Sequence, residues 1–255
     1  MKWIIGDVHG CYDTLIALLK KLPKEATPKD IIFLGDLVDR GKNNRKVIDL
    51  VQGYDCIQGN HEDLMIKAME DYWEYDTPIW YSNWSPNGGD ATYAEYQDEE
   101  EKLKKDIKWM KTLTNHIVYP QEKDPMGRSL IVSHAPCLDF IEEYWDMEDD
   151  DPGLKRTEEL ITWNRSIPKK AQTKYFNVFG HNIIGNFIFN PSGGLKVDSS
   201  VITPEGTLLD NLRGYAAIDT GAFVNNKDSN YFGKLSCIEF PTMKLYQQEN
   251  IEKET

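Results

Sequence analysis

The sequence has no apolar run that could cross a membrane, because nothing in its 255 residues approaches the roughly 18 consecutive apolar residues of a spanning helix. The first six residues, MKWIIG, enter an apolar stretch at once and lack the layout of a signal peptide. We therefore predict a cytoplasmic protein with no membrane partner.

Positive charge is also scarce. The chain has 29 Lys and Arg against 42 Asp and Glu, a net charge of −13, and it has no Lys/Arg-rich patch interleaved with aromatic residues. Binding to long nucleic acid needs clustered cations that neutralise phosphates, so we expect no such partner. Seven acids fall in residues 142–151. We interpret this acidic run as a solvated loop; the alternative is a surface that repels anionic substrates or attracts basic peptides.

Cysteine is rare, and the four cysteines form no CxxC pair. This pattern predicts reduced, structural thiols. Cys11 and Cys137 closely follow His9 and His134, which leaves a metal or redox role as the less favoured alternative.

Five short motifs rich in glycine and in oxygen or imidazole ligands are present, and they contain four of the five histidines. In chain order they are GDVHG (6–10), GDLVDRG (35–41), GNHE (59–62), VSHA (132–135) and FGHN (179–182). The fifth histidine, His116, lies in no such motif. One of these motifs alone is more often an ordinary turn than a site. Five in order are hard to explain by turn chemistry.

Each motif also coincides with the end of a short apolar, β-branched run. The runs are 2–7, 30–36, 54–60, 129–134 and 175–181. Runs that are apolar on both faces predict central buried strands. Helical patterns at 11–22 and 44–52 join the first three and predict a parallel βαβαβ start. Side chains just beyond the carboxyl ends of such strands are the usual place for chemistry in α/β proteins.

The remaining chain divides into an insertion and a second set of strands. Residues 62–114 predict a helical cap, with an amphipathic helix at 98–113 and an aromatic segment at 73–84 whose tryptophans we assign to the core of the cap. Strands are predicted at 196–201, 214–220 and 234–240, in a second sheet packed on the first, and the tail 247–255 is expected to fray. No linker or repeat divides the chain, so one domain, 1–255, is predicted.

These motifs could hold two divalent metal ions about 3.5–4 Å apart, which requires one carboxylate that spans both ions. Asp36 is the natural bridge because its strand is central in the order. Asp7 and His9 are an i, i+2 pair, so their side chains would point the same way from an extended strand end and could bind one ion. Asn60, His134 and His181 could complete the ligand set of the second ion. Ligands of this kind suit manganese, iron or zinc. The flanking glycines would allow tight turns and close backbone approach; they are Gly6, Gly10, Gly35, Gly41, Gly59 and Gly180.

GDVHG, GDLVDRG and GNHE, in that order, resemble the calcineurin-like metallophosphoesterases. The resemblance is strongest to the phosphoprotein phosphatases, in their small bacterial and phage lambda-type branch, and covers nearly the whole chain. Segments 87–92, 163–165, 218–221 and 233–235 are also similar to segments of that branch. The resemblance implies an α/β fold in which two mixed sheets pack as a sandwich flanked by helices, with the metals at the top.

The resemblance also implies roles for individual residues. Asp7, His9 and Asp36 would bind one metal, and Asp36, Asn60, His134 and His181 the other. Arg40 and Arg165, with Asn60, would bind the phosphate. His61, oriented by Asp39, would protonate the leaving oxygen. Two ions, manganese first and iron or zinc as alternatives, would activate a bridging hydroxide for direct in-line attack.

Four functions are considered for this chemistry. The first is a protein Ser/Thr phosphatase, with Tyr activity as an extension, acting as a monomer on phosphorylated proteins, peptides and small phosphate esters. The Asp39-Arg40 pair and Glu62 favour it, since dinucleoside tetraphosphate hydrolases, the second candidate, usually have GNHD and lack that aspartate. Phosphodiesterase activity is the third. A catalytically dead scaffold is the fourth and least favoured, because every expected ligand is present. The cap and the acidic run are where specificity would lie.

Overall fold

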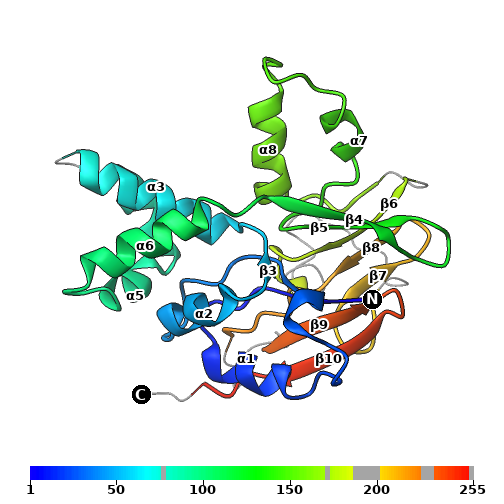
Figure 1. Cartoon of the computed structure of the whole chain (residues 1–255), viewed down its shortest axis with the longest axis horizontal. Coiled ribbons are helices and arrows are strands. Elements are labelled where there is room, and N and C mark those ends of the chain that lie inside the picture. Colours follow the sequence, from blue (N-terminus) through cyan, green and yellow to red (C-terminus); the bar gives the residue numbers. More distant parts are fainter. Residues whose placement is uncertain (76–78, 170–172, 186–201, 225–232, 253–255) are drawn as a thin grey trace.

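A computed structural model describes residues 1–75, 79–169, 173–185, 202–224 and 233–252. Within these residues, two mixed five-stranded sheets pack against each other with helices on their outer faces (Figure 1). The first sheet has the order β10-β9-β1-β2-β3. Its parallel part is β1 (Lys2–Ile5), β2 (Ile31–Phe33) and β3 (Asp55–Cys56), to which β9 (Lys234–Phe240) and β10 (Lys244–Glu249) add in antiparallel pairing.

The second sheet has the order β4-β5-β6-β8-β7. Its parallel centre is β5 (Ser129–Ser133), β6 (Tyr175–Phe179) and β8 (Tyr215–Ala217), and β4 (His116–Lys123) and β7 (Leu208–Asp210) are its antiparallel edges. The predicted sandwich of two mixed sheets flanked by helices is therefore confirmed.

Burial on both faces of the central strands explains their continuous apolar runs. In β1, Ile4 points between the sheets and joins a cluster with Val132 and Val178. Trp3 and Ile5 point to the other face and join the cluster of the helices that cover it. Alternate side chains of one strand thus enter different cores, which is what a run without polar alternation predicts.

The covering helices depend on this packing for their stability. Helix α2 (Asn44–Val51) has eight residues, too few to persist alone in water. Its side chains Val47, Ile48 and Val51 are fully buried. Each contributes roughly 1.5–3 kcal/mol by leaving water, so tertiary contact stabilises the helix. Helix α1 (Tyr12–Leu19) packs on the same face through Leu15 and Leu18.

The insertion between β3 and β4 is helical, as predicted. It runs from α3 (Asn60–Glu74) through α4 (Ile79–Trp84), the short 3-10 turn η2 (Ser85–Asn87) and α5 (Gly89–Ala94) to α6 (Glu100–Met110). In Figure 1, α3, α5 and α6 extend to one side of the sheets.

The prediction that the aromatic segment forms the core of the insertion holds for only one of its tryptophans. Trp84 is completely buried, whereas Trp73 and Trp80 are 38% and 39% exposed, so the prediction is wrong for these two. Trp73 lies at the C-terminal end of α3 and Trp80 at the start of α4. That end of α3 is far from the sheets, where few elements can cover a large side chain (Figure 1).

On the second sheet, α7 (Ile141–Tyr144) and α8 (Leu154–Trp163) cover the outer face through Ile141 and Ile161. The acidic run predicted as a solvated loop begins inside α7, and residues 148–151 are exposed. One further 3-10 turn, η1 (Pro28–Asp30), precedes β2.

Three edge strands, β4, β7 and β10, were not predicted. The side chains of β4 and β10 are only partly buried or exposed, and β7 has only three residues, so none gives a continuous apolar run. The predicted strand 196–201 lies outside the described residues. Fraying of the tail is wrong for residues 247–252. Gln247–Glu249 belong to β10, and the Glu252 carboxylate accepts a hydrogen bond from the Thr14 amide at 2.9 Å. Polar residues can order a chain end through backbone pairing, which hydrophobicity does not reveal.

All four cysteines are buried and free, as expected for structural thiols. None of the helices in the described part of the chain has the length and apolar character needed to span a bilayer.

Candidate metal centre

The predicted site residues meet at one edge of the sandwich, where parallel strands of both sheets end. The loops after β1, β2, β5 and β6 supply them, together with the first turn of α3, which follows β3. The residues, in chain order, are Asp7 and His9; Asp36, Asp39 and Arg40; Asn60 and His61; His134; and His181. All are buried except Arg40. The carboxyl-end location predicted from the sequence is therefore confirmed.

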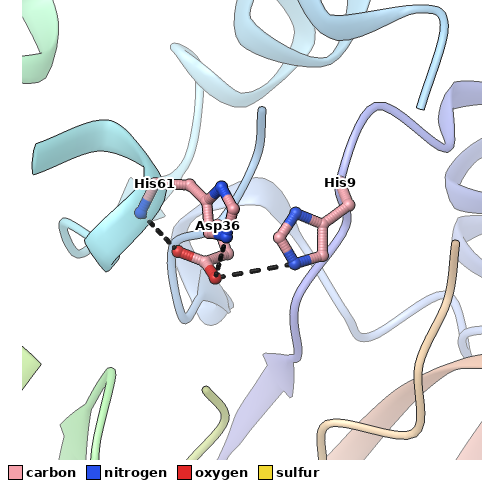
Figure 2. A group of neighbouring side chains, drawn as sticks. All are labelled: His9, Asp36 and His61. Atoms are coloured by element: carbon pink, nitrogen blue, oxygen red, sulfur yellow. Dashed lines mark hydrogen bonds and ion pairs between the residues drawn. The ribbon is translucent and has the colours of Figure 1, made fainter. Parts of the chain in front are cut away.

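Two groups of potential ligands share Asp36. His9, Asp36 and His61 (Figure 2) form one, and Asp36, His134 and His181 form the other; in each, the ligand atoms lie within 4.8 Å of one another. The Asp36 Oδ2 atom lies 3.6 Å from His9 Nε2, and Oδ1 lies 3.3 Å from His134 Nε2. One carboxylate therefore faces imidazoles on both sides, as a bridging ligand must.

Asp36 is held in its ionised form by these neighbours. Burial alone would raise its pKa, but His134, His61 and His9 outweigh burial and lower the pKa well below its usual range. The His61 amide also donates to Asp36 Oδ1 at 3.0 Å. That amide belongs to the first turn of α3, where backbone N–H groups have no partner within the helix.

The hydrogen bonds of His9 and His134 leave a lone pair on each ring facing Asp36. His9 Nδ1 lies 2.9 Å from the Val38 carbonyl, and His134 Nδ1 lies 2.7 Å from the Leu34 carbonyl. A carbonyl only accepts, so the hydrogen sits on Nδ1 and the Nε2 lone pair is free for a metal ion, an orientation common among metal-binding histidines.

Two further atoms, His181 Nε2 and Asn60 Oδ1, are suited to bind a cation. The His181 Nε2 atom is buried and has no partner among the described residues. The Asn60 Oδ1 atom lies 2.9 Å from His134 Nε2 and 2.7 Å from His181 Nδ1. Burial, followed by His134, lowers the pKa of His181 to about 2, so the ring is neutral and can act as a ligand. A metal ion between these groups would satisfy all of them.

Asp7 lies close to the second sheet as well as to β1. The His181 amide donates to Asp7 Oδ2 at 3.0 Å, and a Cβ on Gly180 would lie 1.9 Å from Asp7 Oδ1. Only glycine permits this approach. Burial, then Asp219 and Asp36, raises the pKa of Asp7 well above its usual value. Such crowding of carboxylates is relieved when a cation binds between them.

The predicted geometry of Asp7 and His9 is wrong in one respect. β1 ends at Ile5, and His9 has φ of 47°, so the two side chains do not extend from a regular strand. The loop instead folds onto the next one, with the amides of Val8 and His9 donating to the Asp36 carbonyl at 3.0 and 2.8 Å.

Left-handed backbone is concentrated at this site. Besides His9, it occurs at Asp36, Asp39, Arg40 and His181. Each such residue costs about 1–3 kcal/mol and persists only where surrounding contacts enforce it. Side-chain chemistry at strand ends identified these residues, but nothing local in the sequence revealed their conformation.

His61 and Asp39 form a buried pair beside Asp36. His61 Nδ1 donates to Asp39 Oδ2 at 2.6 Å. Burial lowers the pKa of His61, but Asp36 and Asp39 outweigh it, and the pKa is raised above its ordinary value. The Nε2 atom of His61 then points to Asp36 Oδ2, 3.9 Å away. This atom could act as a metal ligand or as a proton donor, and the Asp39 contact favours a donor.

The two arginines lie at the solvent edge of the site. Both are exposed. Arg40 lies over the Phe223 ring at 4.5 Å, and its Nη2 atom is 3.1 Å from His61 Nε2. Arg165 donates from Nη1 to Asn182 Oδ1 at 3.0 Å. Guanidinium groups at the entrance are suited to bind an incoming phosphate.

Sequence reasoning gave no structural role to Glu62. Its carboxylate accepts hydrogen bonds from the amides of Asp36 and Leu37, both at 2.8 Å, and from Gly59 at 2.9 Å. It thus ties the loop after β2 to the start of α3. Burial and the charge of Asp36 raise its pKa to about 7. The available signal was its place near the start of a helix, the spacing of a capping box.

Asp219 was also missed. It follows β8, is buried, and accepts from the Gly221 amide at 3.0 Å. Burial raises its pKa to about 6. Segment 218–221 had been noted, but nothing in it distinguished a buried site carboxylate from a turn residue.

A buried carboxylate shared by two groups of imidazoles, at the carboxyl ends of parallel strands, is consistent with the two-metal site of the metallophosphoesterase fold. Residues 3–193 match the calcineurin-like phosphoesterase family, and the chain belongs to that family.

Named relatives divide between two activities. Serine/threonine-protein phosphatase 2 of Salmonella typhimurium is 25% identical over 184 residues, which is 71% of this chain and 79% of that protein. The asymmetrical bis(5'-nucleosyl)-tetraphosphatase PrpE of Anoxybacillus flavithermus is 31% identical over 148 residues, 52% of this chain and 56% of that protein. A symmetrical bis(5'-nucleosyl)-tetraphosphatase of Citrobacter koseri is 48% identical over only 73 residues, 26% of this chain and 25% of that protein.

Solved structures agree on the fold. A candidate diadenosine tetraphosphatase superimposes with a TM-score of 0.57 at 16% identity, covering 98% of this chain and 94% of the other. A protein serine/threonine phosphatase from Saccharomyces cerevisiae gives 0.52 at 14% identity, covering 99% and 80%. Likeness at this identity concerns the fold alone.

Proposed function

We propose that this chain is a metal-dependent phosphomonoesterase that removes phosphate from serine and threonine in proteins, with tyrosine as a further substrate. The observation that carries the proposal is the buried Asp39–His61 pair beside the shared carboxylate of Asp36. This pair supplies an oriented proton for an alcohol leaving group, which an oxygen ester of serine requires.

In this proposal the chain holds two divalent ions, manganese first and iron or zinc as alternatives. Asp7, His9 and Asp36 bind one ion, and Asp36 is shared with the other, whose remaining ligands are Asn60, His134 and His181. When bound, the ions supply Lewis acidity to the phosphoryl oxygens and lower the pKa of a water molecule.

The residues of the chain perform the rest. Arg40 and Arg165, with the side chain of Asn60, bind and orient the phosphate from the solvent side. His61 is fixed through Nδ1, so its Nε2 atom delivers the proton to the oxygen that departs from phosphorus. Water attacks opposite that oxygen, and no residue of the chain becomes phosphorylated.

The choice of substrate rests on two residues and on charge. Asp39 and Glu62 match the form expected of phosphoprotein phosphatases. The net charge of −13 opposes a highly anionic dinucleotide substrate. The relatives with bis(5'-nucleosyl)-tetraphosphatase activity support the second candidate, hydrolysis of dinucleoside tetraphosphates.

One substrate panel tests the proposal. Phosphoserine, phosphothreonine and phosphotyrosine peptides would be compared with diadenosine tetraphosphate, each with manganese, zinc, magnesium or a chelator. We expect metal-dependent hydrolysis with the highest kcat/KM on phosphoserine or phosphothreonine peptides. A large preference for the dinucleotide would replace the first candidate with the second.

A further inference from the structure

The helical insertion contacts the site through Asp39. This aspartate is completely buried, and it receives hydrogen bonds from two insertion residues. The Trp84 indole Nε1 lies 3.0 and 2.9 Å from its two carboxylate oxygens, and the Thr92 hydroxyl donates to Oδ1 at 2.6 Å. The Asp39 amide in turn donates to Thr92 Oγ1 at 3.0 Å. Thr92 therefore holds both the backbone and the side chain of Asp39.

The segment between these residues lies directly against the turn that carries Asp39. Gly88 has φ of 102°, and a Cβ there would lie 2.7 Å from the Arg40 amide nitrogen. A Cβ on Gly89 would lie 2.4 Å from the Trp84 ring. Two adjacent glycines thus allow the insertion to contact a turn whose residues have φ of 71° and 67°. No other residue type fits at Gly88 without strain.

We infer that Trp84 and Thr92 are positioning residues that fix Asp39, and through it the proton-donating face of His61. The inference rests on the proposed function. An ionised carboxylate has about four acceptor positions. The indole, the hydroxyl and His61 Nδ1 occupy them from three sides, so the carboxylate cannot rotate. Because Asp39 has a single orientation, it fixes the ring of His61 and directs the His61 Nε2 atom towards the Asp36 carboxylate.

A purely structural role for the insertion predicts a different result. If Trp84 and Thr92 only stabilise the fold, their loss affects all substrates equally. If they position a proton donor, their loss matters most when the leaving oxygen needs a proton. The phenolate of phenyl phosphate is a poor leaving group that needs a proton. The 4-nitrophenolate of 4-nitrophenyl phosphate is a stable anion and departs readily without one.

The variants Thr92→Val and Trp84→Phe remove the two donors and keep most of the side-chain volume. We expect kcat on phenyl phosphate to fall by roughly tenfold to a hundredfold, as for other residues that orient a reacting group. On 4-nitrophenyl phosphate kcat should fall much less than on phenyl phosphate, with KM and bound metal unchanged. Thr92→Ser keeps the hydroxyl, so this variant should retain nearly wild-type activity on phenyl phosphate, in contrast to Thr92→Val.

The insertion offers matched controls. Thr112→Val removes an exposed hydroxyl that donates to the Trp109 carbonyl, and Trp80→Phe alters a partly exposed indole. In neither control should the ratio of kcat on phenyl phosphate to kcat on 4-nitrophenyl phosphate differ from that of the wild type. Equal losses on both esters in Thr92→Val, or no loss, would overturn the inference.

A second measurement keeps this test independent of the proposed function. In protein labelled with ¹⁵N-histidine and loaded with zinc, the Nδ1 proton of His61 should give a downfield resonance because of its short bond to Asp39. We expect Thr92→Val to shift or broaden this resonance and the controls to leave it unchanged. If the wild type hydrolyses neither ester, the proposed function fails, while the resonance still decides the positioning role. An unchanged resonance in Thr92→Val and Trp84→Phe would contradict it.

Discussion

The two sheets contribute unequal halves to the metal centre. The loops of the first sheet carry the acids Asp7, Asp36 and Asp39 together with the proton-donor candidate His61, and most of these residues are fixed by contacts between loops. The second sheet contributes the imidazoles of His134 and His181, whose Nδ1 atoms are bonded to a carbonyl and to an amide oxygen. The difference indicates that most of the buried acids and the Asp39–His61 pair come from the first sheet, whereas the second contributes mainly imidazoles, together with one buried acid, Asp219.

The largest effect is expected where the halves join. Asp36→Asn removes the negative charge that both groups of imidazoles face, so we expect both ions to bind weakly. Turnover should fall by about a thousandfold or more, since two-metal catalysis depends on the shared ligand. Metal content by mass spectrometry and kcat on a phosphopeptide measure this. Asp13→Asn, an exposed acid on α1, is the control, and retention of both ions in Asp36→Asn would contradict the bridging role.

His61→Asn isolates proton transfer within the first half. We expect kcat on phosphoserine esters to fall roughly a hundredfold to ten-thousandfold, the usual contribution of a general acid. Metal content should stay close to that of the wild type. Steady-state kinetics and metal analysis on one preparation provide the comparison. Near-normal turnover, or loss of an ion, would remove His61 from the donor role and favour its alternative as a ligand.

His181→Gln tests the second half. The buried Nε2 atom has no partner among the described residues, but the ring also contacts Asn60 Oδ1 through Nδ1, so its loss should lower the stability of metal-free protein by about 0.5–1.5 kcal/mol, the usual net value of one hydrogen bond. Manganese should raise the Tm of the wild type more than that of the variant, because ligand binding stabilises the folded state. Thermal unfolding with and without metal measures both. An equal rise in Tm would exclude His181 as a ligand.

Glu62→Gln gives the smallest expected change, and mainly in stability. One carboxylate oxygen becomes an NH₂ group, so at least one of three buried amides loses its acceptor, which costs about 1–3 kcal/mol. Urea unfolding of metal-free protein is the measurement. Glu74→Gln, at the exposed end of α3, is the control. Unchanged stability of Glu62→Gln would show that the loops do not need this carboxylate.

The sequence located the site better than it described its support. Asp36, His134 and His181 could be predicted because ligand-type residues follow buried strands, and strand ends in an α/β fold converge. Trp84 and Thr92 could not, because their contacts with Asp39 span 45 and 53 positions and follow no local pattern. β10 was missed for a related reason, since an edge strand is specified by pairing with β9 and only weakly by hydrophobicity.

The contact of Gly180 with Asp7 has a consequence for the hydrophobic core. One residue follows a strand of the second sheet and the other a strand of the first, so the spacing between the sheets determines the spacing between the potential ligands that each sheet contributes. That spacing is set by side chains such as Ile4, Val132 and Val178, which contain no polar atom. A larger side chain among them would separate the sheets and change the distances among the potential ligands without replacing any of them. The apolar interior of the sandwich is thus a determinant of catalytic geometry as well as of stability.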